Sequence, residues 1–218
     1  MKKNFEMNMS EGKILGKLII YSIPLICTNV LQLLFNAADV AVLGMFVSDD
    51  AVAAVGATGA LINLIIGLFV GLSVGANVLV ARFAGEQNMD SSHKTVSTSV
   101  IVSLIAGLFL AFIGYFFAET FLKWTNCDPE VIGMATKYLK IYFIGMPIML
   151  LYNFCASILR AVGDTLRPLI FLVIGGLVNV GLNIFFVAVL KKDVEGVAIA
   201  TVASQAISAV LSIIVLLR

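Results

Sequence analysis

Long apolar stretches alternate with short polar breaks along the whole chain. The apolar segments run over about residues 18–47, 51–81, 95–118, 131–159, 169–190 and 197–217. Each segment is long enough for a helix that crosses the hydrocarbon core of a bilayer, which takes about 20 apolar residues. The breaks are short, as expected between antiparallel neighbours in a helix bundle. The pattern therefore predicts an all-α membrane protein, a six-transmembrane-helix bundle over residues 18–218 that follows a polar amino-terminal segment over residues 1–17.

Composition and charge support a lipid bilayer, and not nucleic acid, as the main partner. Hydrophobic residues make up 61% of the chain and charged residues only 12%, against about 25% charged in an average soluble domain. The net charge of +1 provides no basic surface for nucleic acid. If the spans alternate in direction, nine of the fourteen lysines and arginines lie on the side of the amino terminus. This bias predicts a multi-pass protein of the cell membrane with a cytoplasmic amino terminus.

One acidic residue, Asp39, lies well within a predicted span. A charge at the bilayer centre costs about 2.5–3.5 kcal/mol on insertion scales, so such residues usually face a cavity and carry function. Asn29, Gln32, Asn36 and Asp39 follow one another at steps of three, four and three residues, which keeps them on one helix face. Because lipid offers these groups no partners, we expect the polar stripe to face the bundle interior or water.

Other spans carry polar residues that suit the same site. Asn179 and Asn183 lie one turn apart in the fifth span, and the sixth span carries Thr201, Ser204 and Gln205. Carboxylate, amide and hydroxyl oxygens are ligands for a hard cation such as sodium, and they would equally suit a proton carrier. In the fourth span, an apolar run surrounds two further cavity candidates, Tyr152 and Asn153.

Proline and glycine positions predict bends and close helix contacts. Pro24 in the first span and Pro147 in the fourth each remove a backbone hydrogen bond and permit a bend. Gly67, Gly71 and Gly75 repeat every four residues, a ridge at which another helix is expected to approach closely. An intramembrane enzyme would need paired aspartates, a serine with a base, or metal-spaced histidines within the spans. The predicted spans carry none of these sets, so we expect no enzyme.

Several stretches, taken in order, resemble one family of membrane transporters, the multidrug and toxic compound extrusion (MATE) family. The stretches are LQLLFNAADVAVLG at 31–44, AVAAVGATGA at 51–60, LRAVGDTLRP at 159–168, NVGLNIFF at 179–186 and EGVAIATVASQ at 195–205. The resemblance spans almost the whole chain. It implies one six-helix lobe of a twelve-helix, two-lobe transporter that exports small organic, often cationic, drugs in exchange for sodium or protons.

The resemblance also implies roles for individual residues. Asp39 would be the coupling carboxylate, with Gln32 and Asn36 beside it in the cavity. Cation-site roles, including a sodium site with Asp39, would fall to Asn179, Asn183 and Thr201. Sodium or a proton would be the coupling ion, with no other cofactor, and a second lobe would be a missing partner. Several prokaryotic relatives carry a second aspartate where this chain has Asn183, which leaves the choice between sodium and proton open.

Two other readings of the sequence remain. A flippase for lipid-linked precursors, from the same superfamily, would be expected to have a more cationic cavity, and no lysine or arginine lies mid-span here. A membrane half-protein that does not transport is the second alternative. The leading hypothesis is a cation-coupled antiporter that works by alternating access.

Overall fold

The computed structural model describes residues 14–217, and every regular element within them is helical. The elements are α1 (Ile14–Phe46), α2 (Asp49–Gly85), α3 (Met89–Trp124), α4 (Ile132–Ile144), α5 (Met146–Ala161), α6 (Leu166–Ile184), the π-helical turn η1 (Phe185–Val189) and α7 (Val194–Leu216). Of the predicted amino-terminal segment, residues 1–13 lie outside the described residues, and residues 14–17 form the first turn of α1.

The predicted spans are confirmed, and one of them is broken. Five helices, α1, α2, α3, α6 with η1, and α7, are individually long and apolar enough to cross a membrane. The pair α4 and α5 makes a sixth span when counted as one, with a bend of 53° between its halves. Gly145 separates the halves and Pro147 stands in the first turn of α5, where proline lacks the amide that would continue α4. In α1, by contrast, the helix runs through Pro24 without a break.

Local sequence sets where the long helices begin. Ser48 precedes α2 and its hydroxyl accepts a hydrogen bond from the amide of Ala51 at 3.2 Å. Asn88 does the same for α3, because its side-chain oxygen accepts from the amide of Ser91 at 3.1 Å. Such caps satisfy amides that have no partner within the helix. Between α5 and α6, Gly163 adopts a φ of 87°, a conformation that favours glycine.

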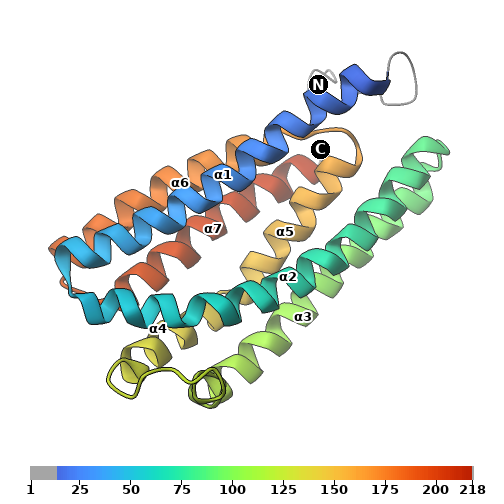
Figure 1. The fold of residues 1–218 in the computed structure, drawn as a ribbon. Coiled ribbons are helices and arrows are strands. Elements are labelled where there is room, and N and C mark those ends of the chain that lie inside the picture. The colour runs from blue at the N-terminus through green and yellow to red at the C-terminus, as the bar shows by residue number, and fades with distance from the viewer. Residues whose placement is uncertain (1–13, 218) are drawn as a thin grey trace.

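Consecutive spans run in opposite directions, so α1 lies along α6 in parallel, whereas α2 lies along α3 antiparallel to it (Figure 1). Helix α5 lies between these groups and contacts α2, α3 and α7. The start of α1 and the end of α7 lie at the same end of the bundle (Figure 1). Large apolar side chains stay exposed on the outer faces, especially on α1 and α3. In a membrane-spanning bundle, such faces are the ones that meet lipid.

Glycines permit close helix contacts, although not along the ridge of Gly67, Gly71 and Gly75 that the sequence predicted. A Cβ atom at Gly107 on α3 would overlap the backbone of Pro147, and one at Gly114 would overlap the ring of Phe143. These contacts seat α3 against the bend between α4 and α5. At Gly67, Gly71 and Gly75 an added Cβ would meet nothing within 4 Å. That ridge therefore makes no close helix contact among the described residues.

Side-chain to backbone hydrogen bonds tie neighbouring helices together. The side-chain amide of Asn77 on α2 donates to the carbonyl of Ser157 on α5 at 2.7 Å. In return, the hydroxyl of Ser157 donates to the carbonyl of Ser73 at 3.0 Å. Three residues further along α5, the carbonyl of Arg160 accepts a hydrogen bond from the hydroxyl of Tyr21 on α1 at 3.0 Å. Apolar side chains gain little by exchanging lipid for another helix, because both surroundings are apolar. Hydrogen bonds between helices are therefore a main determinant of which helices associate.

Candidate functional site

A cavity of about 430 Å³ opens within the bundle, and residues from α1, α2, α4, α5, α6 and α7 line it. Among the described residues that line it, Asp39 has the one charged side chain. The rest of the polar wall consists of carboxamides and hydroxyls. A single carboxylate in an otherwise neutral cavity makes the site attractive to a positively charged ligand.

Helix packing brings Asp39 to the amides of the fifth predicted span. Gly176 on α6 has no side chain, and the ring of Phe35 on α1 occupies the space where a Cβ would lie. Helix α1 therefore approaches α6 closely, and Asp39, one turn after Phe35, comes against Asn183. The side-chain amide of Asn183 donates to one carboxylate oxygen of Asp39. Asp39 is only 7% exposed and Asn183 is fully buried.

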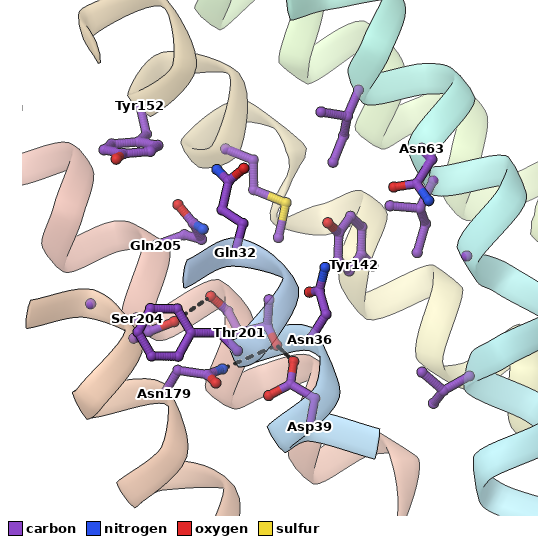
Figure 2. Close-up of a pocket in the computed structure, with 18 of the residues that line it drawn as sticks. Gln32, Asn36, Asp39, Asn63, Tyr142, Tyr152, Asn179, Thr201, Ser204 and Gln205 are labelled. Carbon is purple, nitrogen blue, oxygen red and sulfur yellow. Dashed lines mark hydrogen bonds between the residues drawn. The ribbon is translucent and has the colours of Figure 1, made fainter. Parts of the chain in front are cut away.

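From Asn183 the site continues through hydrogen bonds between neutral side chains, and Figure 2 draws the last of them, from Asn179 to Thr201. Asn183 also donates to the side-chain oxygen of Asn179 at 3.2 Å. Asn179 in turn donates to the hydroxyl oxygen of Thr201 on α7 at 3.3 Å. The structure thus brings together the predicted cation-site residues Asp39, Asn179, Asn183 and Thr201, from three helices.

The Thr201 hydroxyl offers the site an acceptor oxygen, because its one hydrogen is directed to a backbone carbonyl. Its hydroxyl lies 2.9 Å from the carbonyl of Val197 and 3.4 Å from the second carboxylate oxygen of Asp39. The hydroxyl has one hydrogen, and the shorter contact with Val197 is the better hydrogen bond. The second carboxylate oxygen of Asp39 therefore receives at most a weak hydrogen bond from Thr201.

Two unpaired groups at the site would favour a bound cation. The side-chain oxygen of Asn183 is buried and has no hydrogen-bond partner among residues 14–217. The ion pairs found within that part of the chain do not include Asp39. A buried acceptor without a donor costs about 1–3 kcal/mol, and a buried carboxylate without a counter-charge costs more. A bound sodium ion or a proton would relieve the charge, and sodium would also engage the free amide oxygen.

The cavity residues predicted from sequence all line the same cavity. Gln32 and Asn36 point into it from α1, on the face that also carries Asp39 (Figure 2). Tyr152 and Asn153 line it from α5, but both side chains also have structural partners. The hydroxyl of Tyr152 donates to the carbonyl of Pro168 at 3.2 Å, and Asn153 donates to the carbonyl of Met149 at 2.8 Å. Asn29, the first residue of the predicted stripe, is exposed and lies outside the lining.

Sequence reasoning missed an aromatic and polar wall opposite α1. Tyr138 and Tyr142 on α4 line the cavity, with ring centroids 6.0 Å apart, and both are buried. Asn63 on α2 faces the cavity near Tyr142 and Asn36 (Figure 2). The four-residue spacing of the tyrosines was a usable signal, because residues four apart share a helix face. Asn63 was visible as a lone amide inside a long apolar run.

Comparisons with known proteins agree on one family. The family model described as MatE matches residues 24–185. Probable multidrug resistance protein YpnP of Bacillus subtilis is 26% identical over 203 residues, which is 92% of this chain and 45% of that protein. Multidrug export protein MepA of Staphylococcus haemolyticus is 26% identical over 218 residues, which is 98% of this chain and 47% of that protein. The chain spans about half the length of the curated relatives it matches.

Solved structures share the fold over nearly the whole chain. The crystal structure of MATE in the bent conformation superposes with a TM-score of 0.84 at 26% identity, covering 90% of this chain and 44% of that one. The outward-facing conformation of a multidrug resistance MATE family transporter of the MOP superfamily gives 0.85 at 26% identity, covering 92% and 44%. The chain therefore has the fold of one lobe of these structures.

Proposed function

The chain belongs to the MatE family, and we propose that it is the ion-coupling first lobe of a membrane antiporter that exports small organic cations. Its relatives YpnP and MepA are named as multidrug resistance and multidrug export proteins. Because the chain spans about half of their length, a second lobe is expected as the partner that completes the transport path. We place the protein in the plasma membrane, with the amino terminus in the cytoplasm as the lysine and arginine bias favours.

Asp39 carries the proposal. Among residues 14–217 it provides the one charged side chain of the cavity, it is buried, and its hydrogen-bond partners Asn183 and Thr201 are neutral. A carboxylate in such a place gains strongly from a positive particle, since burial without a counter-charge is costly. The oxygens of Asn179, Asn183 and Thr201 complete an oxygen-rich set around it, which suits sodium. A proton on the carboxylate would neutralise the same charge without them.

Loading of Asp39 can bias the position of α1. The carboxylate joins α1 to α6 through Asn183 and to α7 through Thr201. A sodium ion held by Asp39 and the neighbouring oxygens would strengthen this junction, whereas a proton would weaken the hydrogen bond from Asn183 by removing the charge of the carboxylate. Loss of either would leave a charge that draws water into the site. A ligand shifts a conformational equilibrium only by its different affinity for the two states. Exchange of the coupling ion and the organic cation at one cavity would then drive alternating access.

The same cavity supports export of cations over a lipid-linked precursor flippase. A precursor that carries phosphates would be held by lysine or arginine side chains. Among the described residues, neither lysine nor arginine lines the cavity. The relatives named for multidrug export point the same way. If the protein is instead a membrane half-protein that does not transport, no gradient-driven uptake will occur, and the following experiment distinguishes the two cases.

The test is transport by the protein expressed from its complete reading frame and reconstituted in proteoliposomes. Uptake of a fluorescent organic cation is followed under an imposed sodium gradient and, separately, under an imposed proton gradient. We expect one of the two gradients to drive uptake and Asp39→Asn to abolish it. Asp90→Asn is the matched control, because Asp90 is an exposed acid paired with Lys94 at the start of α3. Undiminished gradient-driven uptake by Asp39→Asn would refute the assignment.

A further inference from the structure

Lys140 lies on the side of α4 that faces away from the cavity. Tyr138 and Tyr142 line the cavity, and Lys140 is two residues from each of them along α4. Two residues turn a helix by about 200°, so Lys140 stands on the opposite side. Ile144, one turn after Lys140, is 56% exposed. The second lobe is expected on the cavity side, so this outer side of α4 meets lipid.

The charge of Lys140 has no acidic partner among residues 14–217. The ion pairs in that part of the chain do not include Lys140. Its amine lies over the ring of Tyr115 on α3, 5.3 Å from the ring centroid. Such a contact attracts the amine but leaves its charge in place. Glu119, one turn after Tyr115, is already paired with Lys123 at 2.7 Å, so the two lysines and the glutamate keep a net positive charge.

The amine of Lys140 is accessible near the boundary of the hydrocarbon core. Lys140 is partly exposed, and its amine is not among the buried atoms that lack a partner. The bend between α4 and α5 marks the middle of the fourth span, with helices of 13 and 16 residues on its two sides. Gly107 on α3 packs against Pro147 at this bend, and Tyr115 follows about 12 Å further along α3. Because half of the hydrocarbon measures about 15 Å, the amine lies within reach of lipid phosphates.

An exposed apolar surface extends from Tyr115 towards the bilayer centre. Phe112 and Leu108 precede Tyr115 by three and seven residues on α3, which places the three side chains on one helix face. Phe112 is 66% exposed and Leu108 is 62% exposed. The ring of Phe112 also packs on the ring of Phe116, with centroids 4.9 Å apart. A charge at the boundary next to such a surface matches the two parts of a phospholipid, a charged headgroup and apolar acyl chains.

We propose that Lys140, held over the ring of Tyr115, binds the phosphate of an anionic phospholipid in the leaflet around the start of α4. The amine brings three N–H donors and a charge that pairs with the phosphate. The headgroup of phosphatidylglycerol keeps a net negative charge, whereas choline neutralises the phosphate of phosphatidylcholine. Because α4 also carries Tyr138 and Tyr142, the bound lipid holds a helix of the cavity wall. This inference rests on the membrane-spanning fold and not on what the cavity transports.

The test is a lipid titration of the purified complete protein in detergent, followed by native mass spectrometry. We expect the protein to bind phosphatidylglycerol more tightly than phosphatidylcholine. Lys140→Gln should weaken phosphatidylglycerol binding about fivefold to tenfold. It should change phosphatidylcholine binding less than twofold, which also shows that the variant is folded. Lys140→Arg keeps the charge and should bind phosphatidylglycerol within twofold of the original protein.

Lys191→Gln is the matched control, because it removes the same charge from an exposed turn at the same end of the bundle. It should change phosphatidylglycerol binding less than twofold. Equal effects of Lys140→Gln and Lys191→Gln would show attraction to the general charge of that end and would overturn the proposal, as would equal binding of the two lipids. An excess of inorganic phosphate should not displace phosphatidylglycerol. Displacement would indicate a site for free phosphate and would also overturn the assignment to lipid.

Discussion

Alanine in place of Gly107 is expected to push α3 away from the bend between α4 and α5. The added Cβ atom would lie 2.9 Å from the nitrogen of Pro147 and 3.1 Å from its Cβ, and closer still to its Cα. Carbon atoms in good contact are about 3.5–4.0 Å apart. The obstacle is the backbone of Pro147, which has no side-chain rotamer to escape into, so the helices themselves must separate.

The magnitude follows from the known cost of an overfilled contact. Extra methyl groups in a well-packed interior cost about 1–3 kcal/mol. For a chain of this size each kcal/mol shifts the midpoint of thermal unfolding by about 2–4 °C. Gly107→Ala should therefore lower that midpoint by about 2–12 °C. The contact seats α4 and α5, which carry Tyr142 and Tyr152 in the cavity wall, so cation binding should weaken in parallel.

A thiol-reactive fluorescent maleimide measures this unfolding directly. Cys155 on α5 is fully buried, whereas Cys27 is exposed and Cys127 is partly exposed. In a background carrying Cys27→Ser and Cys127→Ser, Cys155 is the one cysteine left in these 218 residues, and dye labelling of this lobe during a temperature ramp reports its exposure.

Gly71→Ala is the matched control, because a Cβ there would meet nothing within 4 Å. Alanine also has the better helix propensity, by about 1 kcal/mol. The control midpoint should stay the same or rise. If Gly107→Ala behaves like Gly71→Ala, the close contact between α3 and Pro147 is not present in the folded protein.

Two further perturbations test other parts of the structure. Asn77→Ala and Ser157→Ala each remove one hydrogen bond between α2 and α5. Each should lower the free energy of unfolding by about 0.6–1.7 kcal/mol in a denaturant titration in detergent. An unchanged free energy of unfolding in both variants would contradict this pair of hydrogen bonds. Burial and then the charge of Asp128 raise the pKa of the Cys127 thiol above its usual value. Less thiolate is therefore present at any pH below that pKa. In a Cys27→Ser variant, Cys127 should react with maleimide more slowly than a small-molecule thiol of ordinary pKa, and the difference between the two rates should shrink as pH rises. Equal rates at neutral pH would contradict the raised pKa.

The spans were predictable because lipid leaves the backbone few choices. Every amide and carbonyl within the hydrocarbon must find a partner inside the chain, so apolar runs of sufficient length become helices. Pro147 marked the bend in the fourth span for the same local reason. The contact between Pro147 and Gly107 was not predictable, because the two residues are forty positions apart and neither segment carries a signal for its partner. The π-helical turn at Phe185–Val189 likewise has no signal in the apolar pattern.

Most of the polar part of the candidate site could be predicted from the sequence, because a polar side chain within a membrane span needs a partner. Asp39, Asn179 and Asn183 stand out because polar groups in a span need a partner. Tyr138 and Tyr142 did not stand out, because tyrosine is common at membrane boundaries and only the bend turns α4 towards the cavity. Asn29 shares a helix face with Asp39, yet the cavity ends before it. Periodicity assigns a face of a helix, but it does not say how far along that face a cavity extends.

The bend between α4 and α5 also matches a long element to a thin membrane. Laid straight, the residues from Ile132 to Ala161 would measure about 44 Å. With either half upright and the other inclined by 53°, the height along the bilayer normal falls to about 34–36 Å. That height is close to the roughly 30 Å of hydrocarbon, so the kink relieves a hydrophobic mismatch that a straight span would have to meet by tilting. Unbending this span would therefore require it to tilt or the surrounding lipid to thicken, so we expect bilayer thickness to influence the shape of the cavity wall.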